Sequence, residues 1–197
     1  DIIEGEKEHV FTYDNLWNNL DPGAKLGAKA NDVWKPLIVA VHGLCCGGAF
    51  YFLNEADIII CSEDAQFFDP HVTYGLVCAV EPIGLSYRIP IGDVMRIALL
   101  GNDERISAQT AKDIRLVSEV LPKENLWARA HELAAKIADK SPAAVQGSVR
   151  AIWGSFELPR RAALAHAMDQ CLLGRPVAQA GIDHKEKMKG KKVFEVR

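Results

Sequence analysis

The sequence predicts an α/β fold whose C-terminal part is a block of helices. In residues 1–122, short buried strands alternate with helical segments, whereas residues 123–197 carry helical patterns only. Strands that alternate with helices are typical of βαβ units, and a final run of helices adds a further layer. A chain of 197 residues is long enough for one well-buried domain with such an appendix. We therefore expect a core over 1–122 and a helical region over 123–197.

The expected strands are apolar runs rich in β-branched residues. The first is 36–43 (PLIVAVHG), which a glycine closes, and the second is 57–62 (DIIICS). A third and shorter strand, 65–70, stops at its final proline. Runs of this length and composition are typical of strands buried on both faces. The segment 106–122 is expected to form a helix and then a strand, whereas 1–35 is expected to be mostly loop.

The expected helices follow from apolar residues at three- and four-residue spacing. Their ranges are 48–56, 94–101, 126–139, 142–156 and 158–173. Ser141 in the N-cap position and Pro142 at the first helical position predict the start of the second helix in the C-terminal block. The residues expected to face inward in that block are Leu126, Ala130, Leu133, Ile137, Val145, Val149, Ile152, Phe156, Leu164, Met168, and Cys171 or Leu172.

Composition and charge argue against several classes of partner. The net charge is −3, and the one markedly basic stretch, 184–192 (HKEKMKGKK), is typical of a solvated face rather than a nucleic-acid site. No apolar run approaches the ~18 residues of a membrane span. The chain has five cysteines, an odd number whose spacing fits neither a disulfide framework nor a zinc ribbon. We therefore expect free thiols, a cytoplasmic location, no metal, and no nucleic-acid or membrane partner.

The most specific motif begins at Lys35 and ends at Phe67. It reads KPLIVAVHGLCCGGAFYFLNEADIIICSEDAQF: Lys-Pro, an aliphatic strand, a Gly-x-x-x-Gly-Gly turn, a helix and a second strand. This order resembles the crotonase superfamily, the enoyl-CoA hydratase and isomerase enzymes. The likeness continues through RISAQTAKDIRLVSEVLP (105–122) and covers about residues 35–197.

The resemblance implies a spiral of ββα units followed by a helical trimerisation region, and hence a homotrimer or hexamer. It implies an acyl-CoA thioester as substrate, with coenzyme A as part of that substrate and no separate cofactor. It also implies an oxyanion hole of two backbone N–H groups. One of these groups lies upstream in the family, just before an acidic residue. Asp1 is a candidate for that residue, and the family's preceding strands are expected to be absent from this chain.

Gly48 resembles the family's second oxyanion donor. A Gly-Gly turn lets the backbone come close to a ligand, and the first turn of the following helix has unpaired N–H groups. The alternative is a tight strand-to-helix turn that packs against a neighbouring strand. Tyr51, Cys45 and Cys78 are expected to line the substrate pocket, although Tyr51 could instead donate a proton.

The two glutamates that activate and deliver water in the family's hydratases are missing here. Tyr51 and His71 stand in their positions, and Glu81 follows ten residues after His71. In C–C hydrolases of the superfamily, a Pro-His at this place pairs with a later acid. We therefore expect His71 and Glu81 to be the catalytic residues, because an imidazole titrates near neutral pH. The alternatives are a structural histidine and a solvated loop carboxylate.

These observations predict an acyl-CoA-processing lyase or isomerase of the enoyl-CoA hydratase/isomerase family, acting through a thioester enolate held in an oxyanion hole. One alternative is a C–C bond hydrolase of an oxoacyl-CoA or diketone that uses His71 with Glu81. Another is a non-catalytic member that binds acyl-CoA or serves as a scaffold.

Overall fold

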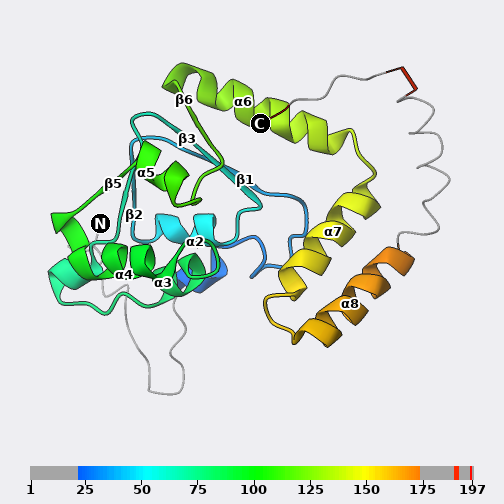
Figure 1. Cartoon of the computed structure of the whole chain (residues 1–197), viewed down its shortest axis with the longest axis horizontal. Helices are drawn as coiled ribbons and strands as arrows, with labels where there is room; N and C mark the ends of the chain where they lie inside the picture. The colour runs from blue at the N-terminus through cyan, green and yellow to red at the C-terminus, as the bar shows by residue number, and fades with distance from the viewer. Residues whose placement is uncertain (1–21, 174–188, 191–195, 197) are drawn as a thin grey trace.

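The computed structural model describes residues 22–173, 189–190 and 196 (Figure 1). It has two small β-sheets with short helices packed around them, and α7 and α8 lie to one side of the sheets. This arrangement confirms the predicted α/β class with a helical block at the end. Asp1 and most of the basic stretch 184–192 lie outside the described residues.

The first sheet is parallel and is built from three strands in the order β1-β3-β6, namely Ile38–Val41, Ile58–Ser62 and Glu119–Leu121. Ile38 pairs with Ile58, and Ile60 pairs with Glu119. The central strand β3 is the most deeply buried, with Ile60 and Cys61 inaccessible to solvent. Its unbroken run of β-branched residues is explained by this position, because a central parallel strand is covered on both faces.

The second sheet has the order β2-β4-β5, with strands Leu44–Cys46, Gln66–Phe68 and Ile106–Ser107. β2 runs parallel to β4, and β5 runs antiparallel to β4. The segment 44–48 was predicted to be a turn only, and this was incomplete because β2 lies within it. A three-residue strand carries no periodic signal, and β2 forms because Cys45 pairs with Phe67 of β4.

A short helix follows each of the first two pairs of strands, so the order strand–strand–helix is repeated along the chain. The α-helices of the core are α2 (Ala49–Asn54), α3 (Val80–Leu85), α4 (Ile91–Leu100) and α5 (Ala108–Asp113). The 3₁₀ helices are η1 (Pro22–Lys25), η2 (His71–Tyr74) and η3 (Gly101–Asp103). α5 is capped by Ser107, whose side chain accepts the Thr110 N–H at 3.2 Å.

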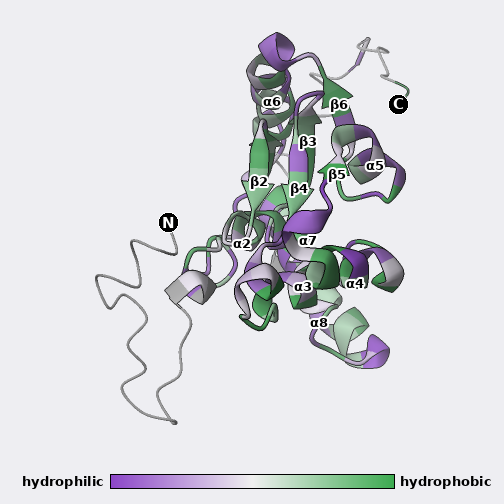
Figure 2. Ribbon diagram, turned by 90° about the vertical axis from the view of Figure 1, so that its left-hand side faces the viewer, coloured by the Kyte–Doolittle hydropathy of each residue, from purple (hydrophilic) through white to green (hydrophobic). Residues whose placement is uncertain are grey.

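The hydrophobic core lies between the sheets and the short helices. Phe50 and Leu53 of α2 pack in it with Phe67 of β4 and Leu85 of α3. Figure 2 shows largely hydrophobic strands at the centre of the molecule. Full burial of one such side chain stabilises the folded state by about 1.5–3 kcal/mol. The buried residues therefore keep the strands that lead into the site in place.

The C-terminal block consists of α6 (Lys123–Ala138), α7 (Pro142–Gly154) and α8 (Arg160–Leu173). Leu126 and Val149 are buried as predicted. The predicted burial was wrong for a larger set, all exposed: Ile152, Phe156, Leu164, Met168, Cys171 and Leu172. The reason is that α8 packs mainly on α7 and leaves its other sides uncovered by described residues. Among the described residues, none of the helices combines the length and apolar character that a membrane span requires.

Candidate active site

The site begins where β4 ends, at the sequence Asp69-Pro70-His71. One oxygen of Asp69, Oδ1, accepts the His71 backbone N–H at 3.0 Å and lies 2.6 Å from the His71 ring nitrogen Nδ1. Pro70 adopts φ −86° and ψ −7°, and this turn folds His71 back over the preceding carboxylate. The Asp69 side chain is only 1% exposed, so the interaction is shielded from water.

The Asp69 contact fixes which nitrogen of His71 carries a proton. An ionised carboxylate can only accept hydrogen bonds, so Nδ1 must be the donor in this pair. The other nitrogen, Nε2, is then the atom that can take up or release a proton. The His71 side chain is 24% exposed, and a ligand can therefore reach it.

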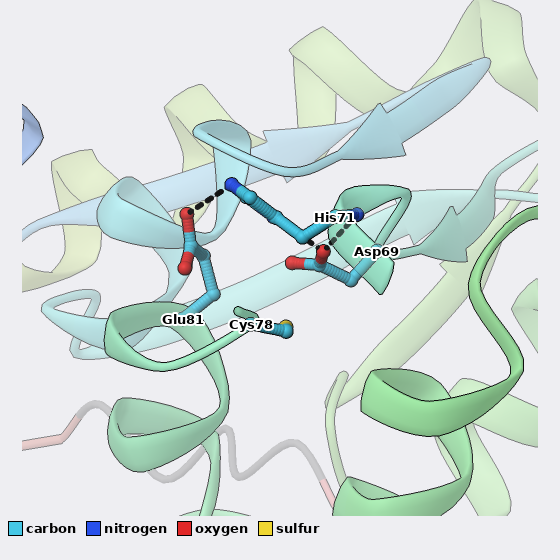
Figure 3. A group of neighbouring side chains, drawn as sticks. All are labelled: Asp69, His71, Cys78 and Glu81. Atoms are coloured by element: carbon cyan, nitrogen blue, oxygen red, sulfur yellow. Dashed lines mark hydrogen bonds and ion pairs between the residues drawn. The ribbon is translucent and has the colours of Figure 1, made fainter. Parts of the chain in front are cut away.

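Glu81 lies on the other side of the His71 ring. It belongs to the first turn of α3, and its Oε1 is 3.9 Å from His71 Nε2 (Figure 3). This distance is too long for a direct hydrogen bond but short enough for a charge interaction. The side chain is 5% exposed, so the alternative of a solvated loop carboxylate was wrong.

The partner that orients His71 was missed by sequence reasoning. Glu81 was expected to be the acid that pairs with His71, whereas Asp69 makes the hydrogen bond and Glu81 faces the opposite nitrogen. The available signal was an aspartate two residues before the histidine, separated from it by proline. Aspartate in such a position commonly accepts a backbone N–H two residues later, which brings its carboxylate to the next side chain.

Cys78 completes a group that we call the His71 cluster, made up of Asp69, His71, Cys78 and Glu81 (Figure 3). Cys78 is half-buried in the segment that precedes α3. Burial raises the pKa of its thiol, and the negative charges of Asp69 and Glu81 raise that pKa further. The thiol is therefore neutral at physiological pH, as suits a pocket lining rather than a nucleophile.

The Gly-Gly turn lies beside the His71 ring. Gly47 has φ +48°, a left-handed conformation that favours glycine, and a Cβ placed there would lie 4.0 Å from His71 Cε1. Gly48 is the N-cap of α2, with φ −54° and ψ −16°. Within the described residues, the Gly48 N–H donates to no carbonyl or side chain, whereas the Gly48 carbonyl accepts the Tyr51 N–H at 3.3 Å. The turn thus combines an unpaired N–H with a nearby histidine.

The three predicted pocket residues do not line a single space. Tyr51 borders a cavity of about 1460 Å³ between α2, α3 and α7, and its ring contacts Gly23 so closely that a Cβ there would lie 2.4 Å away. Cys45 is instead part of the hydrophobic core, where burial raises its pKa to about 12. Of the three, only Cys78 lies in the His71 cluster.

The fold and the site define a class of protein, and comparison with known families identifies it. Residues 1–147 match the model of the enoyl-CoA hydratase/isomerase family. The chain belongs to this family, which confirms the resemblance to the crotonase superfamily.

Particular relatives come from several reaction classes. The chain is 40% identical over 118 residues to the mitochondrial Delta(3,5)-Delta(2,4)-dienoyl-CoA isomerase of Rattus norvegicus, covering 58% of this chain and 35% of the relative. It is 31% identical over 145 residues to the 2,3-dehydroadipyl-CoA hydratase of Escherichia coli K12, covering 74% and 56%. A third relative is the (7aS)-7a-methyl-1,5-dioxo-2,3,5,6,7,7a-hexahydro-1H-indene-carboxyl-CoA hydrolase of Rhodococcus jostii RHA1, at 34% identity with coverages of 64% and 48%.

Solved structures agree with the assignment. An enoyl-CoA hydratase/isomerase from Mycobacterium paratuberculosis superimposes with a TM-score of 0.75 at 32% identity, covering 95% of this chain and 73% of that one. The chain spans from about a third to just over half the length of the three curated relatives above.

Proposed function

We propose that the protein processes an acyl-CoA thioester and that His71 carries the proton in the reaction. The observation that supports this is the ring of His71, which Asp69 holds through Nδ1 while Nε2 faces Glu81 beside the Gly47–Gly48 turn. A base oriented by a carboxylate, next to an unpaired backbone N–H, is the combination that enolate chemistry requires.

The reaction that this geometry favours is hydrolytic cleavage of a carbon–carbon bond in a 3-oxoacyl-CoA. His71 Nε2 takes a proton from water, and the water oxygen bonds to the keto carbon. The bond between the keto carbon and the neighbouring α-carbon then breaks, and its electron pair moves into the thioester as an enolate. The Gly48 N–H stabilises the enolate oxygen, and the imidazolium returns its proton to the α-carbon. The products are a carboxylic acid and a shortened acyl-CoA.

The substitutions in the family's glutamate positions support hydrolysis over hydration. Addition of water to an enoyl-CoA needs two carboxylates on one water molecule in the family's hydratases, and Tyr51 and His71 replace them here. The distance of 3.9 Å between His71 Nε2 and Glu81 Oε1 leaves both groups able to contact one oxygen atom of water or substrate. A relative whose name includes a CoA hydrolase activity is consistent with this choice.

Isomerisation of an enoyl-CoA is the second candidate. It is favoured by the 40% identity to a dienoyl-CoA isomerase and by two proton-carrying groups, His71 Nε2 and Glu81 Oε1, that lie 3.9 Å apart. In this reaction, one group removes a proton from carbon and the other delivers a proton to a different carbon.

Assembly and location complete the proposal. We infer a homotrimer or hexamer, because the exposed apolar residues of α7 and α8, including Leu164 (56% exposed) and Met168 (57% exposed), need a cover. The free state of all five cysteines supports the cytoplasm as the compartment. Light scattering that finds a stable monomer at micromolar concentration would contradict the assembly.

The experiment that tests the reaction is incubation of the protein with a panel of 3-oxoacyl-CoA and enoyl-CoA thioesters in water enriched in oxygen-18. Mass spectrometry should find one heavy oxygen in the released acid. A product of unchanged formula that gains deuterium in heavy water would favour the isomerase instead. Thioester binding by calorimetry with no turnover of any substrate would favour the non-catalytic alternative.

A further inference from the structure

The backbone that carries Glu81 is anchored by a residue of another helix. Asn54, the last residue of α2, donates a hydrogen bond from its side-chain Nδ2 to the backbone carbonyl of Glu81 at 3.0 Å. The two residues are 27 positions apart in the chain, and Glu81 lies in the first turn of α3. The bond therefore joins α2 to the turn from which the Glu81 carboxylate extends toward His71.

The close approach of the two helices at this point depends on Gly84. A Cβ placed on Gly84 would lie 2.2 Å from Asn54 Cγ and Nδ2, so a larger residue would displace the Asn54 side chain or move α3. Alanine is normally favoured over glycine inside a helix. The glycine in α3 is therefore explained by the room that the Asn54 side chain needs.

The Asn54 side chain does not serve stability well. A carbonyl oxygen can only accept a hydrogen bond, so the amide nitrogen must face the Glu81 carbonyl. The amide oxygen, Oδ1, is then buried without a hydrogen-bond partner among the described residues. A buried amide with one unsatisfied end destabilises the fold relative to an apolar side chain of similar shape. The asparagine is better explained by the position that it gives to Glu81.

Attachment of α3 to α2 does not depend on the Asn54 side chain alone. Arg88, three residues after the end of α3, donates from Nη2 to the backbone carbonyl of Asn54 at 2.8 Å and also to that of Ala56. Leu53 of α2 and Leu85 of α3 belong to the same hydrophobic core. These contacts hold the C-terminal half of α3, whereas the Asn54 side chain holds its first turn.

We propose that Asn54 is a positioning residue that holds Glu81 opposite His71 Nε2. The inference rests on the proposed function of His71 and Glu81 as the proton-carrying groups. Their separation of 3.9 Å lets both groups contact one oxygen atom, and a displacement of about 1 Å can lower a rate by about 10²-fold. Asn54 acts through Glu81 and is not itself a catalytic residue.

Replacement of Asn54 by leucine tests the proposal, because Asn54→Leu removes both the donor and the unsatisfied oxygen. We expect kcat to fall by about 10–10²-fold with little change in KM. The double variant with Glu81→Gln should be little slower than Glu81→Gln alone, since both changes remove the same contribution. Phe52→Leu, on an exposed part of the same helix, is the matched control and should keep its kcat. Losses that multiply in the double variant would overturn the proposal.

The ring resonances of His71 in nuclear magnetic resonance spectra give a second measurement that needs no substrate. At fixed pH, Asn54→Leu and Glu81→Gln should each shift these resonances, whereas Phe52→Leu should not. Gly84→Ala keeps the asparagine but crowds it and should shift them as well, and circular dichroism checks the fold of each variant. Unchanged His71 resonances in folded Asn54→Leu or Gly84→Ala would overturn the positioning role. Absence of turnover by the unaltered protein would instead contradict the proposed function and leave these resonances unaffected.

Discussion

The strand core and the α7–α8 pair use the same kind of apolar residues in different ways. In the core, Phe50 and Phe67 are fully buried within the chain's own fold. In α8, Leu164 and Met168 lie four residues apart, a spacing that places them on one face of the helix, but both are more than half exposed. The difference shows that an amphipathic pattern predicts an apolar helix face to be buried. The pattern does not show whether the same chain or another chain buries that face.

The largest effect is expected from substitutions in the candidate active site, which lies at the edge of the strand core. His71→Ala should lower turnover of the substrate about 10²–10⁴-fold, because it removes the group that carries the proton. Glu81→Gln should lower it as well, and the double variant should be little worse than His71→Ala, since the two groups act as a unit. Steady-state kinetics measures these losses.

Fully additive losses would show that His71 and Glu81 work separately. Full activity of His71→Ala on the true substrate would remove the catalytic interpretation. Neither result would affect the comparison of the core with α8, because the site lies on the core alone.

The comparison itself is tested by two truncations of buried and exposed apolar residues. Phe50→Ala should lower the free energy of unfolding by about 3–5 kcal/mol, because it opens a cavity in a packed core. Leu164→Ala should change it by no more than about 0.5 kcal/mol in the dissociated chain. Urea unfolding at a concentration low enough to prevent association measures both values.

A large loss from Leu164→Ala under those conditions would mean that α8 is covered within the chain. A loss of unfolding free energy that appears only at higher protein concentration would sharpen the comparison, because it would show that a second copy of the chain buries the apolar face of α8.

Thiol reactivity gives a second contrast between the regions. Burial raises the pKa of Cys45 to about 12, so its thiolate stays a very small fraction of the thiol at pH 8. Cys171 on α8 is exposed. Alkylation by iodoacetamide should therefore be at least about 100-fold slower at Cys45, and the Cys45 rate should rise with pH up to about 12 in the folded protein. Peptide mapping by mass spectrometry measures the two rates, and comparable rates at pH 8 would contradict the burial of Cys45.

A loss of stability smaller than that of Phe50→Ala is expected at the connection between the two regions. The Trp153 indole N–H of α7 donates to Asp57 Oδ1 at 2.7 Å, just before β3 begins. Trp153→Phe keeps an aromatic ring but loses this bond to a charged acceptor, and it should cost about 1.5–3 kcal/mol. Thermal unfolding followed by circular dichroism measures the loss, with Trp127→Phe on the exposed side of α6 as the control. Equal stability of the two variants would show that Asp57 does not hold α7.

Much of the fold could be predicted because its signals are local. The β-branched run 57–62 forms β3, and Pro142 starts α7 as expected. The strand β2 could not be predicted, because three residues become a strand only through their partner β4. Burial on α8 was predicted wrongly for a related reason, since burial depends on neighbours that a helical pattern does not reveal.

The site was predictable in its members but not in their arrangement. His71 and Glu81 stand out because they lie where the resemblance places catalytic groups, and the fold brings them within 3.9 Å. Their catalytic roles stay predictions. Asp69 was missed because nothing in the pattern shows which carboxylate the ring meets. The expectation of a chain without metal rested on cysteine spacing and stays a prediction; that spacing could not show that Cys78 lies beside two carboxylates and a histidine.

The Asp69–His71 contact has a consequence for the order in which the site forms. Its two residues are separated by a single proline, so their pairing closes almost no loop and depends on no distant segment. Glu81 reaches the same ring from a separate helix, and its approach requires α3 to pack first. We therefore expect the local turn 69–71 to orient the His71 ring early in folding. Glu81 reaches the ring only later, when α3 packs in the tertiary structure.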